Sequence, residues 1–213
     1  MNLAASFDAL GIEVTARPPL TRWLELLREW NERMDLTAAR TENELTDLML
    51  ADAVLLAKHV PEGARVVDIG TGAGAPGLAL ALMRTDLAVT LVEPLAKRAS
   101  FLRTVVGSVG RADIKLSREK GDALAARLPY GFDVAISRAT LPPPSWIPLA
   151  LRLAPVAWAL LARDEPPVIP GARVDADLAY TWPLTNAQRR AVRYVAIARA
   201  HSAGEASGGA RSE

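Results

Sequence analysis

The chain has no cysteine and only two histidines, His59 and His201, among its 213 residues. Without cysteine there can be no disulfide bond, thiolate metal site or cysteine nucleophile, and two histidines argue against a histidine-based metal centre. We therefore expect no bound metal. No apolar run reaches the roughly 18 residues that a membrane helix needs, and the N-terminus lacks the basic region of a secretory signal. These absences predict a cytoplasmic protein that does not enter a membrane.

The chain also lacks an excess of charge of either sign. The 25 basic and 24 acidic residues leave a net charge of +1, which does not indicate a general nucleic-acid binder. If RNA is bound, the basic surface must be local and balanced by acid elsewhere. Half the residues are apolar, and the length suits one α/β domain with an appendage.

The most informative stretch that is present runs from Val66 to Gly77. A short β-branched run ends in a loop with four glycines, and a segment rich in alanine and leucine follows, which predicts a strand, a tight turn and a helix. Glycines at alternate positions permit positive φ and let a ligand approach the bare backbone. The helix that follows offers free N–H groups and a partial positive charge. The stretch therefore predicts a cofactor site.

The rest of the chain alternates strand and helix patterns, which predicts an α/β fold with a mostly parallel sheet. Strands are expected over 66–69, 88–93, 114–116, 132–136 and 156–161, with an antiparallel edge pair over 180–184 and 191–198. Helices are expected over 3–10, 20–34, 41–60, 76–84 and 95–106, and from the prolines at 142–144 to about 153. Thr21 is a possible cap of the second helix, and Thr41 with Glu44 has the form of a capping box.

Two cofactor templates overlap in the glycine loop. Gly72, Gly74 and Gly77 satisfy the dinucleotide fingerprint, which is a weak signal by itself. Gly70, Gly72 and Gly74, directly after a strand that ends in Asp68, fit S-adenosylmethionine-dependent methyltransferases. The Asp68 carboxylate could engage the methionine amino group directly or through water.

Two further residues bear on that choice. Pro76 removes an N–H that a pyrophosphate would use, which favours S-adenosylmethionine. Glu93, at the end of the next strand, is placed to accept both ribose hydroxyls, but an NAD site would use such an acid too. We favour S-adenosylmethionine, with S-adenosylhomocysteine as product, and keep an NAD-type oxidoreductase as the alternative.

These residues also carry a family resemblance. The stretch 68–77 together with 91–102, which holds Lys97, Arg98, Phe101 and Leu102, resembles the bacterial 16S rRNA guanine-N7 methyltransferases, the glucose-inhibited division protein B family. Segments 30–40 and 132–139 are also similar to that family, and the similarity runs from about residue 20 to 165. The resemblance implies a class I methyltransferase that acts on 16S rRNA, free or in the 30S subunit; we expect a monomer. The element pattern itself predicts a helical cap over 1–60 that packs on the core, followed by the Rossmann-like methyltransferase domain over 61–203. The small and polar residues of 204–213 predict a flexible tail.

The chain departs from the family pattern at four places, one of which is the run of three prolines at 142–144. Asp35 replaces an asparagine before Leu36-Thr37, and the family's His-x-x-Asp-Ser keeps only its acid, Asp52. A lysine after the fifth strand is missing, although Arg163 could supply its charge. A homologue that binds the cofactor but has altered or lost methyl transfer is therefore a further alternative.

The proposed reaction needs no general base, because guanine N7 has a free in-plane lone pair and catalysis can rest on positioning. Arg138 ends the fourth strand, where open α/β sheets bind ligands, so we assign it to positioning the guanine or a phosphate. Its alternative is a surface salt bridge. The further candidates for phosphate contacts are Arg40, Lys97, Arg98, Arg103 and Arg163. For Lys97 and Arg98, a solvated helix face is the alternative.

The remaining assignments concern the cofactor and the substrate edge. The expected cofactor-binding residues are Asp68, Gly70, Gly72, Gly74, Pro76, Gly77, Glu93 and Asp122. Asp122 follows the third strand, where methyltransferases contact the adenine, and Arg118-Glu119 is a competing alignment. Trp30 and Asn31 could shape the substrate edge, and for Trp30 the alternative is a position in the core.

Overall fold

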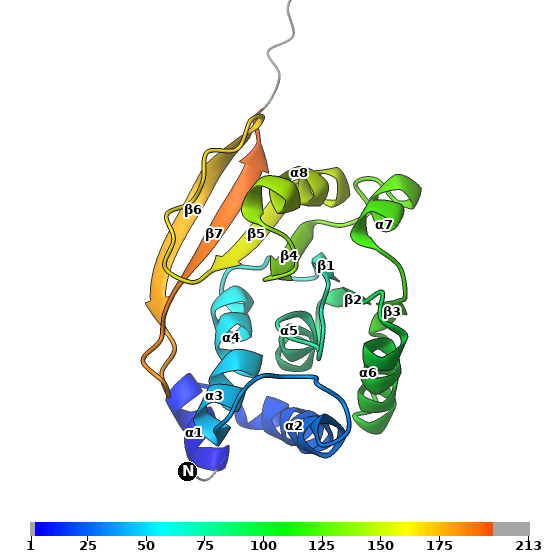
Figure 1. Ribbon diagram of the computed structural model, residues 1–213, viewed down its shortest axis with the longest axis vertical. Coiled ribbons are helices and arrows are strands. Elements are labelled where there is room, and N and C mark those ends of the chain that lie inside the picture. The colour runs from blue at the N-terminus through cyan, green and yellow to red at the C-terminus, as the bar shows by residue number, and fades with distance from the viewer. Residues whose placement is uncertain (1–2, 198–213) are drawn as a thin grey trace, which may run out of the picture.

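The computed structural model describes residues 3–197, and seven strands of this part form one sheet. The strands are β1 (Arg65–Ile69), β2 (Ala88–Val92), β3 (Lys115–Ser117), β4 (Val134–Arg138), β5 (Val156–Leu161), β6 (Ala172–Thr181) and β7 (Gln188–Ala196). Their order in the sheet is β3-β2-β1-β4-β5-β7-β6 (Figure 1). The first five strands are parallel, and β7 runs antiparallel to both β5 and β6. This order confirms the α/β fold with a mostly parallel sheet.

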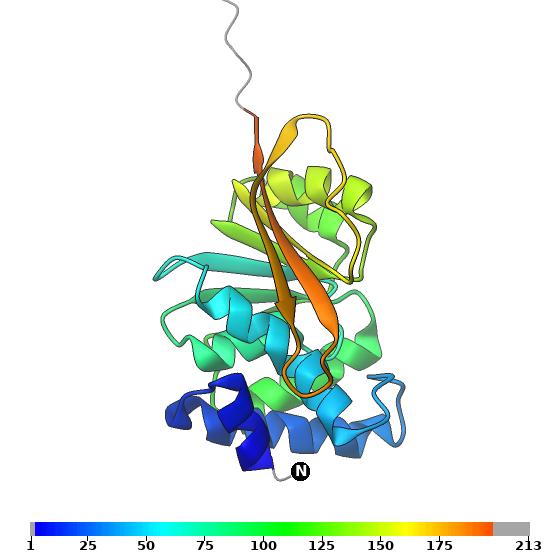
Figure 2. The same ribbon diagram turned by 90° about the vertical axis from the view of Figure 1, so that its left-hand side faces the viewer.

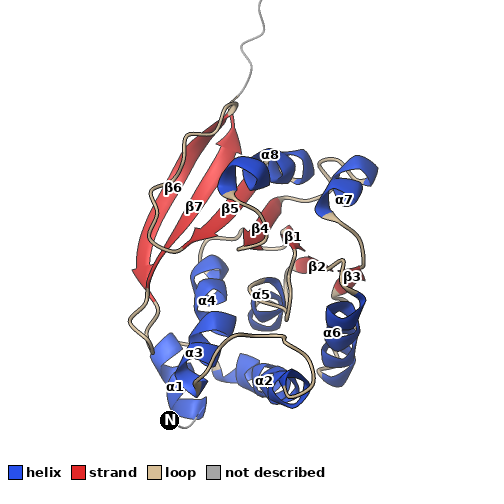
Figure 3. Ribbon diagram, in the orientation of Figure 1, coloured by secondary structure: helices blue, strands red, loops and turns tan. Residues whose placement is uncertain are grey.

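Helices cover both faces of the sheet (Figure 3). Before the sheet come α1 (Leu3–Leu10), a 3-10 turn (Val14–Ala16), α2 (Arg17–Asn31), α3 (Glu42–Thr46), a π-helical segment (Asp47–Ala51) and α4 (Asp52–Ala57). Between strands lie α5 (Gly77–Met83), α6 (Ala96–Ser108), α7 (Gly121–Arg127) and α8 (Pro143–Leu153). Helices α7 and α8 lie on one face, whereas α5, α6 and the N-terminal helices lie on the other.

Alternation along the strands divides the core into two layers, as the two-residue period of a strand requires. Val66 belongs to the layer that includes Trp23 of α2, whereas Val67 belongs to the layer that includes Ile147 of α8. The N-terminal helices thus share a hydrophobic core with the sheet. The boundaries at residues 60 and 203 stay a prediction, and the tail expected over 204–213 lies outside the described residues.

Several expected elements differ in detail. Thr21 is not a cap, because α2 already begins at Arg17 and places two prolines in its first turn. Thr41 does cap α3, since its Oγ1 accepts a hydrogen bond from the Glu44 N–H at 3.2 Å. The Glu44 carboxylate accepts from the Arg40 N–H, one residue before the position that a capping box predicts.

Two elements near the ends of the sheet were harder to predict. Helix α7 was not predicted, because seven residues make fewer than two turns and give little periodicity. The antiparallel edge pair is confirmed, but β6 covers 172–181 and not 180–184. Most of its residues are exposed, so its apolar alternation is weak.

The hairpin of β6 and β7 reaches the N-terminal helices through its turn (Figure 2). There the buried Asp47 carboxylate accepts hydrogen bonds from the Leu184 N–H and from the N–H and hydroxyl of Thr185. Burial raises the pKa of Asp47, and the bonds from Thr185 oppose that shift. The last strands are thereby fixed beside the helix that carries Asp52. Over residues 3–197, none of the helices combines the length and the apolar character needed to cross a membrane.

Candidate active site

The glycine loop follows β1 directly, and its backbone explains three of the four glycines. Gly70, Gly72 and Gly74 have φ of 70°, 61° and 112°, which side chains rarely adopt. An added Cβ at Gly72 would meet only the Gly70 carbonyl oxygen, at 3.9 Å, whereas at Gly74 it would collide with Leu78. Gly72 therefore presents bare backbone to a cavity, and Gly74 packs inward.

Asp68 anchors the end of the glycine loop from the buried strand β1. Its side chain is fully buried, and its Oδ2 accepts a hydrogen bond from the Gly77 N–H at 2.8 Å. A Cβ at Gly77 would lie 2.5 Å from the Cβ of Asp68, so only glycine allows this approach. Burial raises the pKa of Asp68 to about 6. The Thr71 hydroxyl is near enough to lower that pKa, yet its oxygen and the Asp68 Oδ1 have no well-formed hydrogen bond among the described residues.

Glu93 ties the end of β2 to the same loop. Its Oε2 accepts from the Gly72 N–H at 3.0 Å, and its Oε1 accepts from the Leu95 N–H at 2.9 Å. The side chain is only 4% exposed, although it lines the cavity. A carboxylate is thus held in one orientation beside the bare backbone of Gly72.

The cavity has a volume of about 600 Å³ and lies at the carboxyl ends of β1, β2 and β4. This is the point where the strand order reverses, the usual ligand position in an open α/β sheet. It is lined by Leu36, Thr37, Ala38, Leu48, Met49, Gly70, Thr71, Gly72, Ala73, Ala75, Glu93, Pro94, Leu95, Arg98, Arg138, Ala139 and Thr140. The N-terminal helices and the loop after α2 therefore supply one wall.

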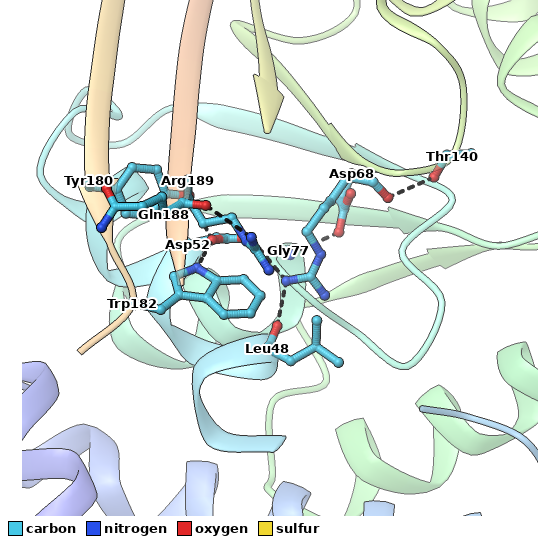
Figure 4. Close-up of polar contacts among 10 residues, drawn as sticks. Leu48, Asp52, Asp68, Gly77, Thr140, Tyr180, Trp182, Gln188 and Arg189 are labelled. Carbon is cyan, nitrogen blue, oxygen red and sulfur yellow. Dashed lines mark hydrogen bonds and ion pairs between the residues drawn. The ribbon is translucent and has the colours of Figure 1, made fainter. Parts of the chain in front are cut away.

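Arg138 lies in this cavity at the end of β4, and it is not a surface residue. Its Nη1 donates to the Asp52 Oδ2 at 3.0 Å and to the Leu48 carbonyl oxygen. The other Asp52 oxygen accepts from the Tyr180 hydroxyl and from the Trp182 Nε1, both at 2.7 Å (Figure 4). Asp52 is 2% exposed and Arg138 is 17% exposed. The expected alternative, a salt bridge, is present but buried.

Asn31 shapes the cavity through the backbone. Its Oδ1 accepts from the N–H groups of Leu36 and Thr37, which fixes the loop that lines the cavity wall. Trp30 packs on Phe101 with ring centroids 5.6 Å apart, a core contact. Asn31 thus shapes the edge of the cavity, whereas Trp30 takes the alternative position, in the core.

The other expected site residues lie in different places. Asp68 is buried behind the loop, and Gly74, Pro76 and Gly77 belong to the loop but do not line the cavity. Asp122 is exposed in the first turn of α7. Glu119, from the competing alignment, pairs with Arg127. Of the basic candidates, Arg98 lines the cavity, Lys97 and Arg40 border two neighbouring hollows, and Arg103 and Arg163 are exposed elsewhere.

Sequence reasoning missed the residues of the hairpin. Tyr180, Trp182 and Arg189 join Arg138 and Asp52 from more than 40 residues further along the chain, and no local motif marks them. The one available signal was Asp52, which survives from the family's His-x-x-Asp-Ser although its histidine does not. An acid kept alone in an apolar helix indicates a buried partner.

Comparison with known proteins identifies the family of this chain. Residues 17–154 match the protein family described as rRNA small subunit methyltransferase G. A ribosomal RNA small subunit methyltransferase G of Halorhodospira halophila is 34% identical over 208 residues, which cover 93% of this chain and 97% of the relative. The chain belongs to this family. The resemblance drawn from the sequence is therefore confirmed.

Other relatives match over shorter lengths. The protein of the same name from Clostridium beijerinckii is 40% identical over 121 residues, which span 55% of this chain and about half, 51%, of that relative. Among solved structures, a SAM-dependent methyltransferase of Aquifex aeolicus superposes with a TM-score of 0.51 at 17% identity, covering 71% of this chain and 92% of that one. A variant of MtNAS in complex with S-adenosylmethionine gives 0.53 at 15% identity, with 92% and 72% covered. The fold is that of S-adenosylmethionine-dependent methyltransferases.

Proposed function

We propose that this protein transfers the methyl group of S-adenosylmethionine to N7 of a guanine in 16S rRNA. The observation that carries the proposal is the cavity in which the bare backbone of Gly72 meets the buried carboxylate of Glu93, in a chain of the rRNA small subunit methyltransferase G family. An oxidoreductase has no comparable support, because the family and the fold both favour methyl transfer.

The residues fit the cofactor on three counts. The absent Cβ of Gly72 leaves room against the loop, and Glu93 offers oxygens that can accept the two ribose hydroxyls. The Thr71 hydroxyl lines the cavity and the Oδ1 of Asp68 lies buried behind it, and neither atom has a hydrogen-bond partner among the described residues. A methionine ammonium group in the cavity would satisfy them, reaching Asp68 through water. S-adenosylmethionine supplies an electrophilic methyl group on a sulfonium centre.

For the methyl acceptor, the chain has to hold the guanine so that N7 lies in line with the methyl group and the sulfur. No proton leaves N7 before attack, so no side chain has to act as a base. Arg138 offers five N–H donors, and only those on Nη1 have partners among the described residues. The donors on Nε and Nη2 remain to orient the guanine or its phosphate.

The ion pair with Asp52 matters for the product. Methylation leaves a positive charge on the purine, which a lone arginine beside it would oppose. Because Asp52 neutralises Arg138, the pair can donate hydrogen bonds without a net charge that repels the product. Exposed Arg40, Lys97 and Arg163 and the half-buried Arg98 are further contacts for phosphates, which contribute affinity and not base identity.

Ribosomal RNA as substrate implies that the protein works in the cytoplasm, and we expect it to act as a monomer. Both points are predictions.

The direct test is incubation of purified protein with labelled S-adenosylmethionine and either unmodified 30S subunits or naked 16S rRNA. We expect label at N7 of a guanine in at least one of the two. Calorimetry with S-adenosylmethionine and with NAD, run on the same preparation, identifies the cofactor. If the cofactor binds and neither RNA takes up label, the chain is a homologue that has lost this transfer and the proposal is wrong.

Replacement of Arg138 tests its role. We expect Arg138→Ala to leave the affinity for S-adenosylmethionine intact and to lower kcat/KM about 100-fold, the usual cost of a misplaced substrate. Arg138→Lys keeps the charge beside Asp52 but not the planar donors, so it should fold well and transfer slowly. Arg152→Ala, an exposed arginine in the last turn of α8, is the matched control. Normal transfer by Arg138→Ala would refute the assignment.

A further inference from the structure

We infer that Arg189 binds a phosphate of the RNA beside the acceptor guanine, in a second cavity that adjoins the first; this inference rests on the proposed function. The second cavity has a volume of about 210 Å³ and shares Leu48, Arg138 and Ala139 with the larger one. Asp52, Trp182 and Arg189 complete the part of its wall nearest the hairpin. A group bound there would lie directly beside Arg138.

Arg189 carries an uncompensated charge at this cavity. Its neighbours in β7 are paired, Arg190 with Glu165 and Asp177 and Arg193 with Asp175. Over residues 3–197, Arg189 makes no ion pair, and its Nη1 donates only to the Gln188 carbonyl oxygen at 3.0 Å. The acid nearest to it in the wall is already neutralised, because Asp52 pairs with Arg138. The cavity therefore has a net positive charge.

The guanidinium is also held in place before any ligand arrives. It lies 3.9 Å from the centroid of the Trp182 ring, a cation–π contact. Trp182 is itself fixed, because its Nε1 donates to Asp52, so one buried carboxylate orients both Arg138 and the platform of Arg189. Figure 4 shows Asp52, Trp182 and Arg189 gathered at the turn end of the hairpin. An arginine held on a ring loses little freedom when it binds an anion.

The same contact decides which part of the RNA fits. Trp182 is 5% exposed, and Arg189 covers the ring face, so this tryptophan is not available for stacking with a base. Arginine binds phosphate through two parallel N–H donors, and phosphate is the anion that every nucleotide of an RNA carries. A phosphodiester next to the acceptor guanine is thus the ligand that matches the charge, the volume and the position.

The test compares Arg189→Ala and Arg189→Lys with the control Arg152→Ala. Binding of unmodified 16S rRNA and 30S subunits is measured by filter retention at several salt concentrations, without turnover. For Arg189→Ala we expect about a tenfold loss of RNA affinity, the effect of one charge-assisted contact. The slope of log K against log salt should fall by about one. Arg189→Lys should recover much of the affinity and all of the slope, and calorimetry should give an unchanged affinity for S-adenosylmethionine.

Methyl-transfer assays supply a second readout, in which the weaker RNA binding of Arg189→Ala must appear as a higher KM for RNA. A salt slope for Arg189→Ala equal to that of Arg152→Ala would overturn the inference, as would a fall in kcat with KM unchanged, which would mean that Arg189 acts only by supporting Trp182. If Arg189→Ala melts early, Arg189→Gln keeps a planar group over Trp182 and must show the same loss of slope. Failure of the wild-type protein to methylate either RNA would count against the proposed function, whereas the binding slopes would still decide the role of Arg189.

Discussion

The cavity has a donor side, around Gly72 and Glu93, for the methyl donor, and an acceptor side, around Arg138 and Asp52, for the guanine that accepts the methyl group. The two sides are built in different ways. On the donor side, the contacts are local in sequence: Asp68 binds the Gly77 N–H nine residues away, and Glu93 binds the Gly72 N–H 21 residues away. On the acceptor side, Asp52 binds Arg138 and Trp182, which lie 86 and 130 residues away. One side is backbone shaped by glycine, and the other is a network of side chains that only the complete fold assembles.

The two sides also differ in charge. Asp68 and Glu93 are buried acids without a salt bridge among the described residues. The acceptor side has two arginines, Arg138 and Arg189, and a single acid. A cationic sulfonium suits the first environment and an anionic RNA suits the second. The difference in charge thus determines which side of the cavity each substrate binds.

The strongest test of the donor side is Gly72→Arg. A side chain at a position with φ of 61° would be strained and would fill the space beside Glu93. We expect binding of S-adenosylmethionine to become undetectable by calorimetry. Gly107→Arg adds the same residue at an exposed helical position with nothing within 4 Å, and should bind normally. If Gly72→Arg still bound the cofactor, the donor side would not depend on bare backbone.

The strongest test of the acceptor side is Asp52→Ala. The substitution leaves Arg138 buried without its counter-charge and deprives Tyr180 and Trp182 of their acceptor. We expect the free energy of unfolding, measured in urea, to fall by about 3–5 kcal/mol, the usual cost of breaking a buried pair. Glu25→Ala removes an exposed pair with Arg22 and should cost under about 1 kcal/mol. Equal losses in the two variants would show that the network contributes no more than a surface pair.

The contrast also explains how much the sequence could predict. The glycine loop, Asp68 and Glu93 were recognisable because the chemistry needs a strand, a turn and an acid at short, fixed spacings. The parallel strands were predicted because buried strands are continuous apolar runs. Trp182 and Arg189 were not predicted as site residues, since Trp182 bonds to Asp52 in α4, 130 residues away, and Arg189 reaches the site only by lying over Trp182. Arg138 was expected at the site from its place at a strand end, but its buried partner was not.

A pH titration tests the donor side further. The pKa of Asp68 is raised from 3.8 to about 6, so between these values the folded protein keeps a proton that the unfolded chain has released. The stability from this group is complete below pH 4 and is lost as the pH rises through 6, a difference of about 3 kcal/mol. We expect Asp68→Asn, which keeps an oxygen for Gly77, to remove that loss.

The measurement is urea unfolding of both proteins at pH 4 and pH 7. The comparison needs the variant, because hydrogen bonds from arginine lower the pKa of Asp86 and Asp133, so those groups stabilise the fold as pH rises. The informative quantity is the change with pH in the difference between Asp68→Asn and wild type. A difference that stayed constant with pH would mean that the folded protein does not retain the proton.

The smallest expected effect concerns the start of the helix that carries the acceptor network. Thr41→Ala removes the hydrogen bond to the Glu44 N–H and should cost about 1 kcal/mol. Transfer should stay within about twofold of wild type, because Asp47 is tied to Leu184 and Thr185 and holds the helix beyond its first turn. Thr104→Ala, in the exposed middle of α6, should cost nothing, since alanine favours the helix. A large loss of transfer in Thr41→Ala would mean that the network depends on the whole helix and not on its two anchored acids.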